Sequence, residues 1–161
     1  KKLNETWEEK AKNLEKKYNI LVIGRSKKQK IVISKDYIIE ELYIENTPYI
    51  YKYYDTGFTQ PNSFVNQKMI SWAKKISKNF SGDLLELYCG LGNFTLPLSK
   101  NFNKVLATEV SKTSIKAAIE NCELNGIKNI FFARLNASES AQALKKQRSF
   151  NRLKNIDLNS F

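Results

Sequence analysis

The stretch LLELYCGLGNFTLPLSKNFNKVLATEV, residues 84–110, decides the fold. An apolar run leads into Gly90-Leu91-Gly92, a short apolar segment follows, and a second apolar run ends at Glu109. This order predicts a strand, a tight loop, a helix and a second strand, because glycine lets backbone come close to a ligand beside the strand end. Glu109 lies at the end of the second run, where a carboxylate can accept hydrogen bonds from both ribose hydroxyls. The unit therefore predicts a site for a nucleoside-bearing cofactor.

The third position of the glycine motif indicates which cofactor fits. A dinucleotide site needs a further small residue there, and this chain has Thr95. A ligand with a ribose but no phosphate, such as S-adenosylmethionine, suits the loop better. Glu86 on the first strand adds a second carboxylate, which disfavours phosphate and suits a cationic sulfonium or amine. The alternative is a tight turn in an ordinary α/β protein, with Glu109 as a capping residue.

Strand and helix patterns alternate through residues 58–161. Apolar spacing predicts a helix over 62–78, whose apolar face would contain Val65, Met69, Trp72, Ala73 and Ile76. Helices are also predicted over 93–100 and 111–124, and another begins in 139–150; strands are predicted over 84–88, 104–109 and 129–137. This alternation favours parallel pairing and an α/β layer architecture.

The segment 1–57 has a different pattern, which predicts a small α+β segment. Trp7, Ala11, Leu14 and Tyr18 mark one face of a helix over 4–18. Two β-rich runs joined by the basic turn RSKKQK (25–30) follow, and then YIIEELYIENTPYIYKYY (37–54), which is broken at ENTP. The predicted domains are therefore 1–57 and 58–161.

The net charge of +11, from 27 basic and 16 acidic residues, favours a polyanionic partner. The alternative is that the positive charge reflects the base composition of an AT-rich genome, since the chain is rich in Lys, Asn and Ile. The candidate phosphate contacts are Arg25, Lys27, Lys28 and Lys30 in the basic turn, which could equally be a solvated hairpin tip. The nearby Tyr43, Tyr49, Tyr51, Tyr53 and Tyr54 could stack a base, although a half-buried sheet is the favoured interpretation.

Composition excludes several kinds of site. The chain has no histidine, so His-based catalysis and His metal ligation are excluded, and no metal site is predicted. Cys89 and Cys122 lie in patterned elements, which favours a reducing cytoplasm and burial as small residues. No apolar stretch is long enough to predict a membrane span. The start has neither Met nor a signal sequence, so a fragment of a longer chain is expected.

Four motifs together resemble the tRNA uracil-C5 methyltransferases, which are class I S-adenosylmethionine-dependent enzymes. They are FTQPN (58–62), DLLELYCGLGNF (83–94), VLATEV (105–110) and FNRLKNIDL (150–158), and the likeness extends upstream through VIGRSKKQKI. FTQPN combined with LYCGxGNF is specific, and FNRL followed by IDL separates the tRNA branch from its ribosomal-RNA relatives. Leu91 departs from the polar residue expected between the glycines, without affecting the backbone role.

The resemblance implies a partial Rossmann-like methyltransferase core, preceded by an RNA-facing α+β segment. The whole protein would transfer a methyl group from S-adenosylmethionine to a uridine in the T loop of tRNA, forming 5-methyluridine, in the cytoplasm. The residues that match the family's cofactor contacts are Gln60, Tyr88, Asn93 and Glu109, with Gly90 and Gly92 forming the loop.

The resemblance also implies what these residues lack. In the family a Cys thiolate adds to uracil C6 and a Glu removes the C5 proton, and both follow a D-P-P-R motif that does not occur here. We therefore predict no catalytic residue in this chain, which alone should be inactive. The alternatives are a ribosomal-RNA uracil-C5 methyltransferase and a non-catalytic RNA-binding protein with a degenerate core.

Overall fold

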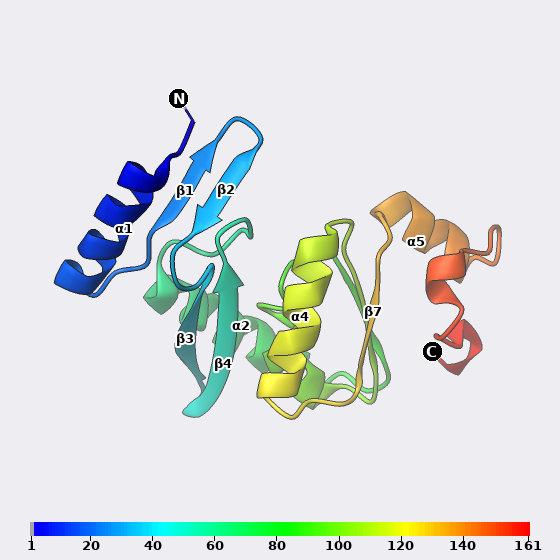
Figure 1. Cartoon of the computed structure of the whole chain (residues 1–161). Helices are drawn as coiled ribbons and strands as arrows, with labels where there is room; N and C mark the ends of the chain where they lie inside the picture. The colour runs from blue at the N-terminus through cyan, green and yellow to red at the C-terminus, as the bar shows by residue number, and fades with distance from the viewer. Residues whose placement is uncertain (1) are drawn as a thin grey trace. The chain divides into compact units, whose positions relative to one another are not determined.

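The structure is a computed structural model that describes residues 2–161, with the exception of the Ser160 side chain. The chain divides into two compact units, Lys1–Ile38 and Ile39–Phe161. The larger unit contains the glycine loop and all the elements around it (Figure 1).

The smaller unit consists of a helix packed on a two-stranded hairpin. Helix α1 (Glu5–Tyr18) begins after Asn4, whose side chain accepts a hydrogen bond from the Trp7 amide at 3.0 Å. Strands β1 (Ile23–Ser26) and β2 (Gln29–Val32) pair antiparallel. The Trp7 ring lies against Gly24, where any Cβ atom would collide with it. The predicted helix and the two predicted strands are therefore confirmed, but the predicted turn over 25–30 is too long, because Arg25 and Ser26 pair with Lys30 and Gln29 and only Lys27 and Lys28 lie between the strands.

Only the first half of the predicted apolar face of α1 is covered. Ala11 is buried, whereas Leu14 and Tyr18 are 45% and 56% exposed. The reason is length: a 14-residue helix extends about 21 Å, whereas a four-residue strand extends about 13 Å. The hairpin is too short to cover the whole helix.

The larger unit begins with a hairpin of β3 (Tyr37–Ile44) and β4 (Thr47–Tyr54). Glu45 and Asn46 form its two-residue turn with φ angles of 50° and 66°, as in a type I′ turn. Tyr49, Tyr51 and Tyr53 are at most 6% exposed, so the half-buried sheet is the correct interpretation for these three tyrosines. Base stacking is excluded for them in this arrangement.

This hairpin packs on helix α4 (Lys112–Leu124), and for that reason the compact unit begins at Ile39 rather than at residue 58. The Asn121 side chain accepts a hydrogen bond from the Lys52 amide at 2.8 Å and donates one to the Leu91 carbonyl at 3.1 Å. Asn125 exchanges two hydrogen bonds with the Ile50 backbone, at 2.9 and 2.7 Å. Side-chain amides thus satisfy the edge of β4, where a further strand would otherwise pair.

The α/β architecture is confirmed by a parallel sheet in the order β5-β6-β7, formed by Leu84–Leu87, Val105–Thr108 and Ile130–Ala133. All four residues of β6 are buried, as expected of a central parallel strand. The carboxyl ends of β5 and β6 meet at one edge of the sheet, because Leu87 is opposite Thr108.

The helices follow the predicted alternation (Figure 1). Helix α2 (Ser63–Ser77) is capped by Asn62, α4 by Ser111 and α5 (Ala137–Leu144) by Asn136. The short helix α3 (Thr95–Leu98) continues into the turn Ser99–Asn101, and two further turns, Asn151–Leu153 and Leu158–Ser160, end the chain. Within residues 2–161 no helix is both long and apolar enough to cross a membrane.

The predicted apolar face of α2 is wrong. Val65, Met69, Trp72 and Ile76 are between 40% and 65% exposed, whereas the buried residues are Asn66, Ile70 and Ser77. Periodicity fails here because α2 has apolar residues on two faces, and the inward face is chosen by polar contacts. Asn66 pairs with Asn93 in the glycine loop, and Ser77 accepts a hydrogen bond from Asn101 at 2.9 Å.

Candidate functional site

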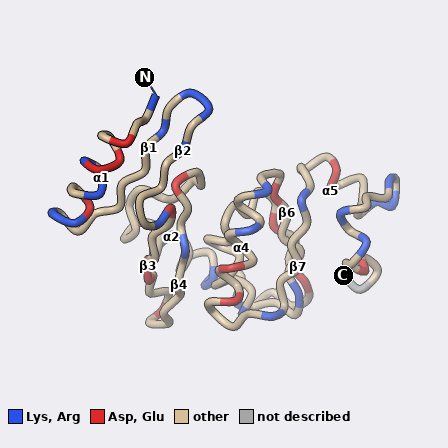
Figure 2. Tube along the Cα trace, viewed as in Figure 1, with Lys and Arg blue, Asp and Glu red and all other residues tan. Residues whose placement is uncertain are grey.

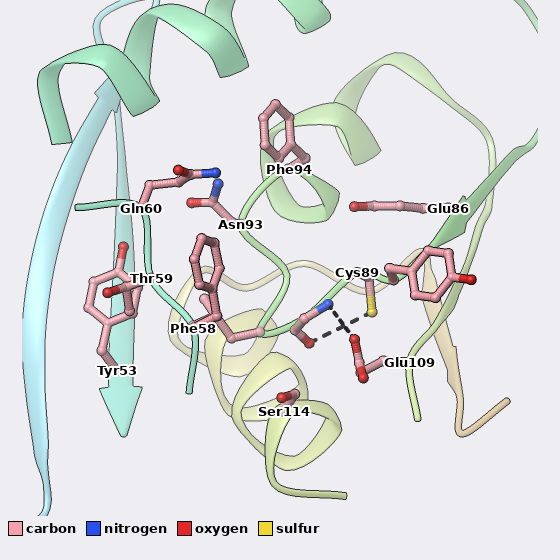
Figure 3. A pocket seen from close by; sticks show the side chains of 13 residues that line it. Tyr53, Phe58, Thr59, Gln60, Glu86, Cys89, Asn93, Phe94, Glu109 and Ser114 are labelled. Atoms are coloured by element: carbon pink, nitrogen blue, oxygen red, sulfur yellow. Dashed lines mark hydrogen bonds between the residues drawn. The ribbon is translucent and has the colours of Figure 1, made fainter. Parts of the chain in front are cut away.

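A cavity of about 400 Å³ lies in the larger unit at the carboxyl ends of β5 and β6 (Figure 3). Ligands of open α/β sheets bind at this edge. The lining residues are Tyr53, Phe58, Thr59, Gln60, Glu86, Tyr88, Cys89, Gly90, Leu91, Asn93, Phe94, Glu109 and Ser114. The cavity therefore brings together three segments that are distant in the sequence.

The glycine loop has left-handed backbone at alternate positions. The φ angles are 58° at Tyr88, 56° at Gly90 and 88° at Gly92. At Gly92 a Cβ atom would also lie 2.5 Å from Leu96 Cδ1, whereas at Gly90 no atom lies within 4 Å. Gly92 is thus required by conformation and packing, and Gly90 leaves open space beside its backbone. Tyr88 adopts this region without being glycine, which costs about 1–2 kcal/mol.

Glu109 is held by backbone amides on both carboxylate oxygens. Oε1 accepts hydrogen bonds from the amides of Val110 and Ser111, each at 2.8 Å, and Oε2 accepts one from Gly90 at 3.2 Å. Since a carboxylate oxygen accepts about two hydrogen bonds, Oε2 retains capacity for a ligand hydroxyl. Holding two hydroxyls would require Glu109 to release a backbone amide. Glu109 therefore braces the turn before α4, whose N-cap is Ser111, and keeps one acceptor position free.

Asn93 is fixed by a reciprocal amide pair with Asn66. The Asn66 side chain donates to Asn93 Oδ1 at 2.9 Å, and the Asn93 side chain donates to Asn66 Oδ1 at 2.8 Å. The Tyr51 hydroxyl donates to the Asn93 carbonyl at 2.8 Å. Each Asn93 amide atom has one hydrogen bond left for a ligand. Asn66 is a supporting residue that the sequence analysis missed, because no local pattern links two positions so distant in the sequence.

The remaining cofactor candidates also line the cavity. Gln60 lies beside Asn93 on one wall, while Glu109 and Ser114 lie on the other side (Figure 3). Tyr88 is 68% exposed, so it is not a core residue. The structure thus places Gln60, Tyr88, Gly90, Asn93 and Glu109 around one cavity, and Gly92 supports the loop from behind.

Glu86 provides an uncompensated buried acceptor. Its Oε2 atom is buried without a hydrogen-bond partner, and so is the hydroxyl of Thr95. Burial raises the pKa of the Glu86 carboxyl to about 7. The Thr95 hydroxyl lies beside the carboxylate and opposes part of this rise in pKa. Because buried polar atoms are normally paired, a carboxylate with only this hydroxyl beside it could accept a further hydrogen bond from a ligand donor. The sequence analysis had identified Glu86 itself as a second carboxylate suited to a cationic group.

Both cysteines are buried, as predicted. Cys89 is 5% and Cys122 is 7% exposed, and neither forms a disulfide. Burial raises the pKa of the Cys122 thiol to about 12 and also raises the pKa of Cys89, an effect that the Glu86 and Glu109 carboxyls reinforce. Neither thiol is therefore poised as a nucleophile near neutral pH.

The four basic candidates lie on the β1–β2 hairpin of the smaller unit (Figure 2). Lys27 and Lys28 form the exposed turn, and Arg25 is directly opposite Lys30 across the strands. Lys30 forms an ion pair with Asp36 at 2.9 Å, so part of its charge is neutralised locally. The hairpin therefore concentrates positive charge mainly at its tip. Among the described residues, no cluster of potential metal ligands is present.

Solved structures that share this fold are methyltransferases. The S-adenosylmethionine-dependent methyltransferase from Agrobacterium tumefaciens covers 79% of this chain and 41% of its own, with a TM-score of 0.55 and 18% identity. The T. thermophilus 16S rRNA N2 G1207 methyltransferase, solved with AdoMet and guanosine, covers 85% of this chain and 41% of its own, with a TM-score of 0.53 and 17% identity. The fold is therefore a partial Rossmann-like core of the class I S-adenosylmethionine-dependent methyltransferases.

The sequence comparison specifies the family within that class. The tRNA (Uracil-5-)-methyltransferase family profile matches residues 1–161, and the chain belongs to this family. The tRNA/tmRNA (uracil-C(5))-methyltransferases of Aliarcobacter butzleri and Saccharophagus degradans are both 57% identical over 161 residues, which is 100% of this chain. The chain spans only 43% and 44% of these two relatives. The resemblance seen in the four sequence motifs is thus confirmed.

Proposed function

We propose that the cavity binds S-adenosylmethionine. We further propose that the whole protein transfers its methyl group to C5 of a uridine in the T loop of tRNA, forming 5-methyluridine. The observation that carries the proposal is the convergence of Gln60, the glycine loop and Glu109 on one cavity. The chain's relatives are named as tRNA/tmRNA uracil-C5 methyltransferases, which supports the reaction and the substrate.

The residues around the cavity fit this cofactor chemically. Glu109 would hold the ribose through Oε2, which has a free acceptor position beside the Gly90 amide. The unpaired carboxylate of Glu86 would face the positive charge of the methionine part, while Gln60 and Asn93 would offer amides to its polar end. When bound, the cofactor supplies an electrophilic methyl group. The role of this chain is to bind and orient the cofactor, since its buried thiols are unsuited to attack uracil.

A methyl-transfer assay tests the reaction. The whole protein, incubated with unmodified tRNA and S-adenosylmethionine, should form 5-methyluridine in the T loop, detected by nucleoside mass spectrometry. A ribosomal-RNA fragment serves as the competing substrate. Methylation of ribosomal RNA alone would overturn the tRNA assignment. RNA binding without cofactor binding would instead identify a non-catalytic RNA-binding protein.

We also propose that residues 1–57 face the RNA, that residues 58–161 form the first half of the methyltransferase domain, and that the protein acts in the cytoplasm. Exposed Lys27 and Lys28 at the hairpin tip, together with Arg25 and Lys30, would contact tRNA phosphates (Figure 2). Replacing all four by Gln should weaken tRNA binding and lower its dependence on salt, because fewer counterions are released. An unchanged salt dependence would contradict this role.

A further inference from the structure

A second basic surface lies on the larger unit, in the segment that follows helix α5 (Figure 2). It contains Lys145, Lys146, Arg148, Arg152 and Lys154, which are all exposed. No Asp or Glu occurs between Ser140 and Ile156. The segment therefore contributes five positive charges without interleaved acids, unlike α1, whose lysines alternate with glutamates.

The scaffold of this surface is ordered. Leu153 is 7% exposed and belongs to the same buried cluster as Leu106 of the central strand β6, and Phe150 packs against that cluster. The Arg152 guanidinium forms an ion pair with Glu139 at 2.7 Å and donates a hydrogen bond to the Arg134 carbonyl. These contacts hold the backbone of residues 150–153 against the larger unit, so the positively charged side chains project from a backbone of fixed course.

Most of the positive charge on the surface is not neutralised locally. Arg152 is paired with Glu139, and Lys146 donates a hydrogen bond to the uncharged Asn159 side chain at 2.7 Å. Within the described part of the chain, Lys145 and Lys154 have no carboxylate within ion-pairing distance. Arg148 lies over the Phe150 ring, 4.9 Å from its centroid, and its charge also acts on the Glu139 carboxylate that pairs with Arg152. Favourable interaction with the α5 dipole explains lysines at the helix end, but not Arg148 and Lys154 beyond it.

We propose that this surface, defined by Lys145, Lys146, Arg148, Arg152 and Lys154, binds the sugar-phosphate backbone of the RNA substrate. The inference rests on the proposed function and adds an RNA contact on the unit that contains the cofactor cavity. Lys145, Arg148 and Lys154 are the phosphate contacts, and Arg152 is a positioning residue because its guanidinium is engaged by Glu139. Phosphate contacts position an RNA without reading its sequence, so the surface would orient the substrate rather than select the uridine.

The test compares two triple variants of the whole protein that lose the same charge. The first replaces Lys145, Arg148 and Lys154 by Gln. The second replaces Lys75, Lys78 and Lys128, which are exposed and lie outside the surface, by Gln. Binding of a tRNA transcript is measured over a range of salt concentrations. The first variant should bind about tenfold more weakly near 0.15 M salt, and its slope of log affinity against log salt should fall by about 2. The second should remain close to wild type.

Each outcome decides a separate claim. S-adenosylmethionine binding by calorimetry confirms that both variants are folded, since none of the six residues lines the cavity. Equal RNA affinity in the two variants would contradict RNA binding by this surface and would leave the proposed function intact. A wild-type protein that binds cofactor but no RNA would overturn both the RNA partner and the surface.

Discussion

At the residue scale, two carboxylates on neighbouring strands have opposite surroundings. Glu109 accepts three backbone hydrogen bonds, whereas Glu86 has a buried oxygen with no partner. The first arrangement fixes a carboxylate in one orientation, whereas the second gives the ionised form little support beyond the nearby Thr95 hydroxyl. Glu109 is thus already held in place, and under the proposed function Glu86 would gain a partner when the cofactor binds.

This contrast predicts that cofactor affinity depends on pH. The pKa of Glu86 is raised to about 7 by burial, and a bound cation would favour the ionised form and lower it. Below pH 7, the affinity for the cofactor should therefore increase by up to about tenfold for each unit by which the pH is raised. Above pH 7 it should stay nearly constant. Calorimetric titrations between pH 6 and pH 8 measure the effect. Glu86→Gln should flatten the profile, and a wild-type profile that is already flat would contradict the role of Glu86.

Gly92 should be the least replaceable glycine of the loop. Gly92→Ala combines a φ of 88° with a contact of 2.5 Å to buried Leu96, so we expect a loss of about 2–4 kcal/mol in the free energy of unfolding. Gly126→Ala is the matched control, since its φ is 62° and no atom lies within 4 Å of the added Cβ. It should cost about 1–2 kcal/mol. Urea unfolding measures both, and equal losses would show that Leu96 moves aside freely.

At the element scale, the sequence was sufficient where local chemistry determines the structure. The ranges predicted for α2 and α4, 62–78 and 111–124, agree with the observed helices within one residue at each end, because helix ends depend on the residues of one turn, such as the caps Asn62 and Ser111. The buried face of α2 was not predicted correctly, because it depends on a contact with a residue distant in the sequence. The Asn66–Asn93 pair selects that face, and a polar residue gives no apolar periodicity to detect.

The outward face of α2 should make this chain self-associate. Phe64, Trp72 and Ile76 are 65%, 65% and 51% exposed, and exposed apolar patches promote association. Trp72→Lys with Ile76→Lys should restore a monomer, as measured by light scattering after size-exclusion chromatography. The control Lys75→Gln with Lys78→Gln changes exposed residues of the same region and should still associate. A monomeric parent chain would contradict this expectation.

At the scale of the whole molecule, the α/β core was predicted from the sequence, whereas the boundary between the two compact units depends on contacts between distant residues. The compact unit begins at Ile39 because the β3–β4 hairpin is tied to α4 through Asn121 and Asn125. Those contacts join positions that are far apart in the sequence, and no composition change reveals them. The functional division at residue 57 remains a proposal about RNA and cofactor roles.

The chain by itself should not methylate tRNA. Both thiols are buried with raised pKa values, so neither is poised to add to uracil C6. Nucleoside analysis after incubation with S-adenosylmethionine and tRNA should therefore detect no 5-methyluridine, while the whole protein serves as the positive control. Product formed by this chain alone would contradict the expectation that the buried Cys89 and Cys122 thiols are unreactive.

The most direct test of the central claim is the dissociation constant of S-adenosylmethionine, measured by calorimetry on the whole protein and on its Glu109→Ala variant. Wild type should bind, and the variant should bind about 10–100-fold more weakly, because hydrogen bonds to a charged group contribute about 1.5–3 kcal/mol. Glu123→Ala, at an exposed position outside the cavity, should leave the constant unchanged. Equal affinity in wild type and Glu109→Ala, or no binding by wild type, would contradict the assignment of the cavity to this cofactor.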